Sequence, residues 1–223
     1  MLLDLLLPRI CPVCGRVLLK GEKQLCLKCL SEIPFTYFWT WSGNPAENRF
    51  LGKVDIVRAA SLFYYRDGSC YKNIIHLFKY KGRRKLGKFM GEMLGEKLLS
   101  NGIYEDIDVI IPVPLHPLKR WKRGYNQAEI IALAIGNVIR KPVDCSSLVR
   151  RRYTVSQTRK SASQREKNVA GAFRIKSHSL LRGRHILLVD DVLTTGATLS
   201  SCACEIMKIE GCRVSFATLA FAE

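Results

Sequence analysis

Hydrophobic runs of strand length alternate with stretches of helical periodicity over most of the chain. Short, continuous apolar runs such as 107–113 and 185–189 are typical of buried strands. Apolar residues spaced three and four positions apart, as in 85–99, indicate amphipathic helices. The pattern predicts strands over 58–65, 107–113, 185–189 and 213–220, and helices over 71–80, 85–99, 127–139 and 197–210. This alternation predicts an α/β fold, with a parallel sheet that is flanked by helices and connected by right-handed crossovers.

The first 57 residues differ from the rest of the chain in composition and in hydrophobic pattern. Residues 1–35 contain paired cysteines and no apolar core of their own, and residues 36–57 are rich in aromatic, Gly, Asn and Pro residues, as loops are. We therefore expect a small N-terminal module at 1–35, a linker or packing arm at 36–57 and the α/β domain at 58–223. A polar, basic stretch at 149–169 predicts a mobile lid, with a non-catalytic surface loop as the alternative.

Composition and charge narrow the class of partner. The chain has 48% apolar and 25% charged residues, which is ordinary for a globular protein with a buried core. Its 36 Lys and Arg exceed its 19 Asp and Glu, so the net charge is +17 and the surface attracts phosphorylated molecules, nucleic acid or acidic membranes. The apolar runs are far shorter than the ~20 residues of a membrane span. The apolar start contains Asp4 and offers no small-residue cleavage site, so we expect no export and a cytoplasmic location.

Four of the nine cysteines form two CxxC pairs, Cys11 with Cys14 and Cys26 with Cys29, separated by eleven residues. Four thiolates at this spacing can surround one Zn²⁺ tetrahedrally, and Gly15 can take the positive φ that turns the chain behind the first pair. Because protein thiolates would fill all four positions, the zinc would be structural. Two redox pairs or free thiols are the alternative, which is less favoured because neither pair opens a helix after a strand.

The run from 186 to 198 contains an apolar strand, an acidic pair and a small, hydroxyl-rich loop that opens onto a helix. Asp190 and Asp191 can accept hydrogen bonds from vicinal ribose hydroxyls or bind a metal ion. The backbone N–H groups and threonine hydroxyls of 195–198 can bind a phosphate at the positive end of the helix, where Gly196 permits close approach. The run as a whole favours a sugar-phosphate site over the alternative, an Asp pair that only caps a helix.

Within this run, residues 189–198 resemble the phosphoribosyl-pyrophosphate motif of type I phosphoribosyltransferases. Further motifs resemble the ComF family, and together they cover nearly the whole chain: the paired CxxC module, FKYKG at 78–82, PVPLHP at 112–117, RGYNQ at 123–127, TVSQT at 154–158 and REKNVAGAF at 165–173. Members of that family pair a zinc ribbon with a phosphoribosyltransferase-like domain and are associated with competence and DNA uptake. The resemblance therefore implies a type I phosphoribosyltransferase-like sheet behind a small N-terminal zinc ribbon.

The resemblance also implies roles for individual residues. Asp190 and Asp191 would bind the ribose hydroxyls, and Arg123 would join them as the third candidate catalytic residue. The substrate-binding set would comprise Lys79, Asn126 and Gln127, the 5′-phosphate loop Thr194, Thr195, Gly196, Ala197 and Thr198, and the lid residues Gln157, Arg159 and Arg165. The turn with Arg123, Asn126 and Gln127 would bind the pyrophosphate with its Mg²⁺. Lys119, Arg120 and Lys122 in the same turn suit a polyanion, with a solvated basic face as the alternative.

Two functions of different class follow. The first is an enzyme that transfers phosphoribose from phosphoribosyl pyrophosphate, with Mg²⁺, to an acceptor that the sequence does not identify. The second is a non-catalytic protein of DNA uptake that associates with single-stranded DNA or with other uptake proteins. Interleaved basic and aromatic residues, as in RWKR at 120–123, suit single strands, although aromatic residues at helical spacing more often belong to a core. The acidic pair and the Thr/Gly loop favour retained donor binding.

Overall fold

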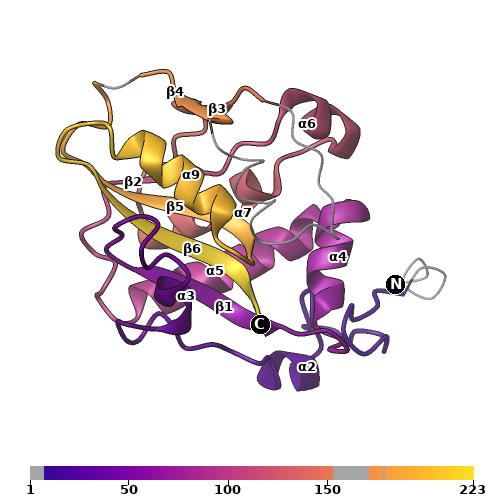
Figure 1. The fold of residues 1–223 in the computed structure, drawn as a ribbon. Helices are drawn as coiled ribbons and strands as arrows, with labels where there is room; N and C mark the ends of the chain where they lie inside the picture. The colour runs from indigo at the N-terminus through magenta and orange to yellow at the C-terminus, as the bar shows by residue number, and fades with distance from the viewer. Residues whose placement is uncertain (1–7, 153–170, 178) are drawn as a thin grey trace.

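Four parallel strands form the central sheet, in the order β1-β6-β5-β2 (Figure 1). The computed structural model describes residues 8–152, 171–177 and 179–223. The strands are β1 (Ala59–Tyr65), β2 (Val109–Pro112), β5 (His185–Leu193) and β6 (Arg213–Ala222). The predicted α/β fold is confirmed. Because all four strands run in one direction, their carboxyl ends meet at one edge of the sheet.

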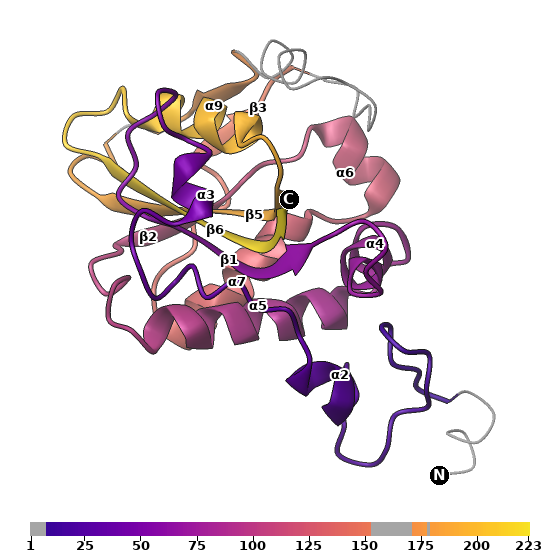
Figure 2. The same ribbon diagram turned by 60° about the horizontal axis from the view of Figure 1, so that its bottom comes forward.

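Helices cover both faces of this sheet (Figure 2). On one face lie α5 (Arg84–Leu99) and α7 (Gln127–Ile139), and on the other lie α9 (Ala197–Ile206) and the short α3 (Pro45–Asn48). Alternate side chains of β5 point to opposite faces, so Leu187 joins one hydrophobic core and Leu188 the other. The continuous apolar run of β5 is therefore explained by burial on both sides.

Several predicted boundaries agree with the structure and others do not: β2 is shorter than predicted at both ends, and β6 continues two residues further. α7 has the predicted bounds, while α4 (Lys72–Tyr80) and α5 each begin within one residue of the prediction. The strand predicted at 185–189 is longer, because β5 continues to Leu193, which still pairs with Phe221 of β6. The helix predicted over 197–210 is shorter and ends at Ile206. The acidic pair ends the apolar run of β5 but not its hydrogen bonds to β6.

The sequence pattern does not predict several short elements. These are α2 (Leu27–Ser31), α3, α6 (Pro117–Arg123), and the antiparallel pair β3 (Leu148–Arg150) and β4 (Phe173–Ile175). The stretch predicted as a lid begins within β3, and its residues 153–169 lie outside the described part of the chain. α6 follows β2 at the carboxyl edge of the sheet, so it places a helix where the sequence suggests only a turn.

The segment 36–57 packs on the sheet through aromatic side chains. The ring centroids of Phe38 and Phe221 lie 5.2 Å apart, and those of Phe50 and Phe216 lie 4.4 Å apart. Asn44 is fully buried, caps α3 by accepting from the N–H of Ala46, and donates to the carbonyls of Phe38 and Ala59. These contacts attach the segment to β1 and β6 beside the loop that precedes α9.

The cysteine-containing segment lies beyond the sheet, next to α4 and α5 (Figure 2). Its apolar side chains Val13, Leu18 and Leu25 are buried in the same core as α4 and α5. The Tyr71 hydroxyl, just before α4, donates to the carbonyl of Cys29 at 2.9 Å. Among the described residues, no helix combines the length and the apolar character needed to cross a membrane.

Candidate functional site

The four cysteines of the two CxxC pairs come together in one cluster. Their sulfur atoms all lie within 4.8 Å of one another, and the Sγ atoms of Cys14 and Cys26 are 3.7 Å apart. Four thiolates at ~2.3 Å from one Zn²⁺ would have sulfurs about 3.8 Å apart, so the residues fit a tetrahedral zinc site. Gly15 has a φ of +76°, as the turn behind Cys14 requires. With four protein ligands the site is a structural zinc centre.

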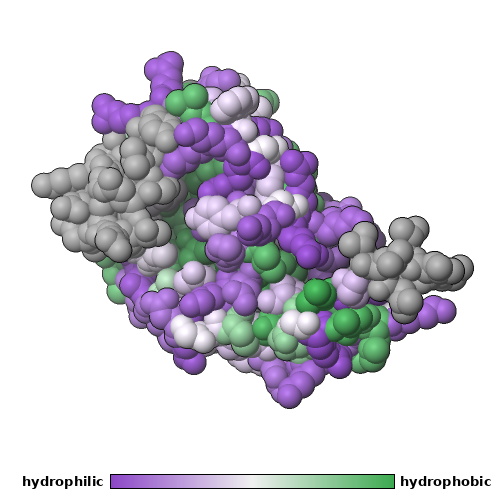
Figure 3. Space-filling view, turned by 90° about the vertical axis from the view of Figure 1, so that its right-hand side faces the viewer, coloured by the Kyte–Doolittle hydropathy of each residue, from purple (hydrophilic) through white to green (hydrophobic). Residues whose placement is uncertain are grey.

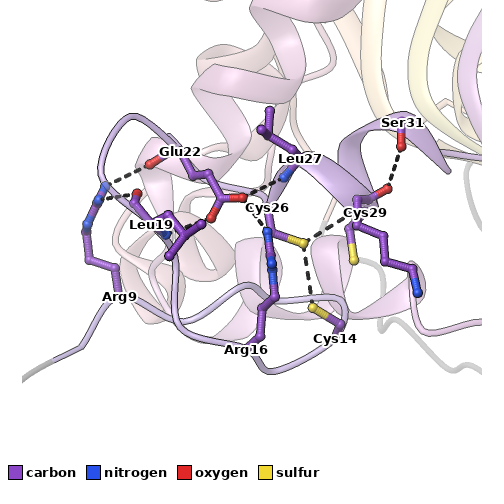
Figure 4. A network of polar contacts seen from close by, with 10 residues as sticks. Arg9, Cys14, Arg16, Leu19, Glu22, Cys26, Leu27, Cys29 and Ser31 are labelled. Atoms are coloured by element: carbon purple, nitrogen blue, oxygen red, sulfur yellow. Dashed lines mark hydrogen bonds and ion pairs between the residues drawn. The ribbon is translucent and has the colours of Figure 1, made fainter.

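Glu22 organises the chain around this centre (Figure 4). Its carboxylate accepts hydrogen bonds from the N–H groups of Leu27 at 2.8 Å and Leu19 at 2.7 Å, and it pairs with Arg16. These two backbone hydrogen bonds lower the pKa of Glu22 below its ordinary value, and Arg16 adds to the effect. Sequence reasoning did not identify Glu22. A single acid between two CxxC pairs gives no sign that it accepts backbone hydrogen bonds from both sides.

The second cluster lies at the carboxyl edge of the sheet, where Asp190 and Asp191 sit inside β5. Asp191 is 9% exposed, and its Oδ1 lies 2.9 Å from Nζ of Lys79, in the last turn of α4. The structure therefore brings together three of the predicted site residues. Burial works against the charge of Lys79, but the carboxylate of Asp191 outweighs it and raises the pKa of Lys79 above its ordinary value.

The two acids differ in electrostatic environment. Burial, and then the charge of Asp191, raise the pKa of Asp190 from its ordinary value to about 7. The cations Lys79 and Arg150 oppose this rise. The raised pKa favours the protonated form of Asp190, while Asp191 has Lys79 as its counter-ion.

This raised pKa predicts a pH dependence of stability. The folded protein holds the Asp190 proton up to a pKa of about 7, whereas the unfolded chain loses it near the ordinary value of 3.8. Because the folded state binds more protons in this window, we expect the free energy of unfolding to fall as pH rises from ~4 to ~7, with no further fall from this group above it. Urea unfolding of the wild type and of Asp190→Asn across this range measures the effect. Equal slopes in the two proteins would contradict it.

The loop from Thr194 to Thr198 follows β5 and leads into α9. Gly196 begins the helix with a φ of +78°, and a Cβ at this position would lie 2.7 Å from the ring of Phe50. The glycine is therefore required by the fold itself, through its left-handed backbone and the packing of segment 36–57. Lys53 of the same segment donates from Nζ to the carbonyl of Thr195 at 3.1 Å. Thr194 is exposed, and Thr195 and Thr198 are partly buried at the first turn of α9, where the N–H of Ala197 donates to Oγ1 of Thr195 at 3.5 Å.

Basic residues from α6 and β3 gather near the acidic pair. Burial lowers the pKa of Lys119 to about 8, and the positive charges of Arg150 and Arg123 contribute to the shift. Nη1 of Arg123 donates to Oε1 of Gln127 at 2.6 Å, and its guanidinium lies 5.5 Å from the ring centroid of Tyr80. Two positive charges that lower the pKa of a third cation form a site that an anion would stabilise. Arg150 was not among the predicted site residues.

The structure assigns Asn126 and Gln127 to positions at the start of α7. The Asn126 side chain accepts from the N–H of Ala128 and donates to the carbonyl of Val113, so it joins the end of β2 to α7. Gln127 is 2% exposed, and its amide nitrogen has no hydrogen-bond partner among the described residues. Gly124, with a φ of +78°, ends α6. Gln157, Arg159 and Arg165 lie outside the described residues.

The carboxyl edge of the sheet faces the viewer in Figure 3. The surface there is hollowed, and hydrophilic residues predominate around the hollow. Lys79 from α4, Asp190 and Asp191 from β5, Arg123 from α6 and Arg150 from β3 all belong to this edge. An acidic pair and a group of cations thus lie side by side, which is an arrangement for a ligand that carries both hydroxyl groups and phosphates.

Comparisons with known proteins match both parts of the chain. A phosphoribosyl transferase domain model matches residues 121–223, and a double zinc ribbon domain model matches residues 2–38. The DNA utilization protein YhgH of Salmonella typhimurium is 30% identical over 203 residues, which cover 87% of this chain and 82% of that protein. Competence protein ComFC of Bacillus subtilis is 27% identical over 213 residues, covering 94% and 77%.

Competence protein F of Haemophilus influenzae is 38% identical over 104 residues, which cover 46% of this chain and 43% of that protein. The relatives are therefore named as competence and DNA utilization proteins. This chain itself has a zinc ribbon domain followed by a phosphoribosyltransferase domain. On these grounds the chain belongs to the ComF family.

Proposed function

We propose that this protein binds phosphoribosyl pyrophosphate with Mg²⁺ at the carboxyl edge of its sheet and transfers phosphoribose to an acceptor. The observation that carries the proposal is the juxtaposition of the acidic pair on β5 with the cations Lys119, Arg123 and Arg150. The acids suit the ribose hydroxyls and the cations suit the pyrophosphate. The loop at the start of α9 suits the 5′-phosphate, because a helix N-terminus offers free N–H groups.

The same arrangement supports the chemistry of transfer. When the bond from ribose C1 to the pyrophosphate oxygen breaks, positive charge develops on the ribose and negative charge on the leaving group. The carboxylates of Asp190 and Asp191 lie on the side of the positive charge, and Arg123 and Lys119 stabilise the departing pyrophosphate. Mg²⁺, bound by pyrophosphate oxygens and by Asp190, would add charge neutralisation of the leaving group. One or two carboxylates with substrate phosphates are the donor set that Mg²⁺ uses in proteins, so the residues fit it.

Thermal unfolding with added ligand tests this proposal. A ligand present at 100 times its Kd stabilises the folded state by about 2.7 kcal/mol, which for a domain of this size raises the Tm by roughly 5–10 °C. We expect this rise with phosphoribosyl pyrophosphate and Mg²⁺, and a smaller rise with ribose 5-phosphate, which lacks the pyrophosphate. Identical curves with and without phosphoribosyl pyrophosphate would contradict the proposal.

A second candidate function is the binding of single-stranded nucleic acid, and a basic groove favours it. Two hollows of about 560 and 650 Å³ adjoin at Arg84 and Lys85. The first lies between the cysteine segment and the α4–α5 turn, and the second between α5, α6 and α7. The cations that line them are Arg9, Lys23, Arg83, Arg84, Lys85, Lys88 and Arg120. Their acidic lining residue, Glu129, is paired with Arg120 at 3.2 Å.

Salt-dependent binding of an oligonucleotide tests this second function. Arg83→Ala with Lys85→Ala removes two exposed cations of the groove, so the slope of log affinity against log salt should become shallower by about 1.4, at −0.7 per phosphate contact. The matched control is Arg174→Ala with Lys176→Ala, two exposed cations on and beside β4, which should keep the wild-type slope. Fluorescence anisotropy between ~50 and ~200 mM salt gives both slopes. Equal slopes in all three proteins would exclude the groove as the binding surface.

A further inference from the structure

The ion pair between Lys79 and Asp191 joins two elements that are far apart in the sequence. Nζ and Oδ1 lie 2.9 Å apart, and the two side chains are only 22% and 12% exposed. Lys79 comes from the end of α4, whereas Asp191 lies in the central strand β5. A pair so little exposed is weakly screened by salt and by water, so each charge is the main counter-ion of the other.

The surroundings of α4 hold Lys79 in this position. The neighbouring Phe78 is fully buried, and its carbonyl accepts a hydrogen bond from the hydroxyl of Tyr125. On the other side, the ring of Tyr80 lies under the guanidinium of Arg123. Both neighbours of Lys79 therefore contact the stretch from the last residue of α6 to the start of α7. The packing of the last turn of α4 therefore fixes the backbone position from which the Lys79 ammonium group reaches the acidic pair.

We propose that Lys79 is the resident counter-ion of Asp191 and excludes divalent cations from the acidic pair until the donor brings them. An ammonium group within hydrogen-bond distance of Oδ1 occupies the position from which a metal ion would bind this carboxylate. It also neutralises the charge that would attract the ion. One part of this proposal, that the donor carries the metal ion into the site, rests on the proposed function. The exclusion of metal from the donor-free protein rests on the ion pair alone.

Without Lys79, the edge of the sheet would present two adjacent carboxylates with less compensating charge. Such a pair is a binding site for a hard divalent cation, which prefers carboxylate oxygens and retains several waters. With Lys79 in place, the charge of Asp191 is neutralised and its carboxylate does not bind Mg²⁺. The metal must then enter the site bound to the phosphates of the donor, which supply its ligands. The lysine thus sets the order in which metal and donor bind.

Titration with Mn²⁺ in the absence of any donor tests this role, because electron paramagnetic resonance counts free Mn²⁺ directly. We expect the wild type to show no saturable site at the acidic pair. Lys79→Met should create one site per chain that binds Mn²⁺ at least about tenfold more tightly than the wild type does. Adding Asp191→Asn to Lys79→Met should remove that site.

Three further variants separate the role of Lys79 from general effects of charge and folding. Lys81→Met removes the same charge from an exposed position two residues away and should behave as the wild type does. Lys79→Arg retains a cation and should still exclude Mn²⁺. Lys79→Gln replaces Lys79→Met if circular dichroism shows that the methionine variant does not fold.

Two results would overturn the proposal. The first is a saturable Mn²⁺ site in the wild type that Asp191→Asn removes, because the lysine would then fail to exclude the metal. The second is a Lys79→Met or Lys79→Gln protein that folds but gains no Mn²⁺ site. A protein that excludes Mn²⁺ as described but does not bind phosphoribosyl pyrophosphate would contradict the proposed function and leave the counter-ion role of Lys79 in place.

Discussion

Replacing Asp190 and Asp191 together by Asn should weaken the binding of phosphoribosyl pyrophosphate by at least ~2 kcal/mol, or roughly 30-fold. Asparagine keeps the shape of each side chain but removes the carboxylates that, on the proposed function, would accept hydrogen bonds from the ribose hydroxyls. The change also leaves Lys79 without the carboxylate that lies 2.9 Å from its Nζ. A buried cation without its partner adds to the cost of the substitution. Isothermal titration of the variant against the wild type gives the loss directly.

A matched control separates local from general charge effects. Asp55→Asn with Asp67→Asn makes the same change of two carboxylates at exposed positions outside β5. We expect the control to bind the donor as the wild type does, apart from a small effect of the more positive net charge. Equal affinity of the Asp190/Asp191 variant and the wild type would show that the ribose lies elsewhere.

Replacing Cys26 and Cys29 together by Ser should abolish zinc binding and destabilise the N-terminal segment. Protein purified without added metal should carry about one zinc per chain, and the double variant should carry almost none, because two ligands cannot hold a structural zinc. Binding of structural zinc is coupled to folding, so its loss costs several kcal/mol in a small segment whose buried side chains only join the core of the α/β domain. Metal analysis by mass spectrometry and urea unfolding measure the two effects.

Loss of zinc is expected to affect the donor site as well, because α4 connects the two. The Tyr71 hydroxyl donates to the carbonyl of Cys29 before the first turn of α4, and Lys79 reaches Asp191 from its last turn. Loss of zinc should therefore also weaken donor binding. The control variant, Cys70→Ser with Cys145→Ser, changes two exposed cysteines outside the cluster and should keep zinc, stability and affinity. Stoichiometric zinc in the Cys26/Cys29 variant would contradict the assignment of these ligands.

The zinc centre was predictable because its ligands are local in sequence. Two CxxC pairs and a short connection define the geometry almost completely, and the four sulfur atoms lie within 4.8 Å of one another as expected. The framework around them was not predictable, since the role of Glu22 depends on backbone groups of Leu19 and Leu27 that only the fold presents to it.

The main elements of the α/β domain were predictable where periodicity and end signals agree. α7 has the predicted bounds because Asn126 caps it and apolar residues repeat along it. β5 was predicted too short because the acidic pair ends the hydrophobic signal, although pairing with β6 continues to Leu193. α6 was missed, although Pro117 at its start and Gly124 after its end are the usual signals of a helix.

The acidic pair was recognised from its local motif, but its surroundings come from distant parts of the chain. Lys79 lies on α4 and Arg150 on β3, and both act on the charges of β5 only in the folded protein. Gly196 illustrates a different limit. The sequence suggested a glycine that lets a phosphate approach, whereas the structure shows that Phe50 fills the space beside it. Burial and contacts between distant residues cannot be predicted from a local sequence pattern.

Isothermal titration of the wild-type protein with phosphoribosyl pyrophosphate, with and without Mg²⁺, tests the central claim most directly. The predicted result is saturable binding of one donor per chain that requires Mg²⁺, is much weaker for ribose 5-phosphate, and is lost in the Asp190→Asn, Asp191→Asn protein. An absence of saturable binding by a folded, zinc-containing wild type would contradict the claim that the carboxyl edge of the sheet is a donor site.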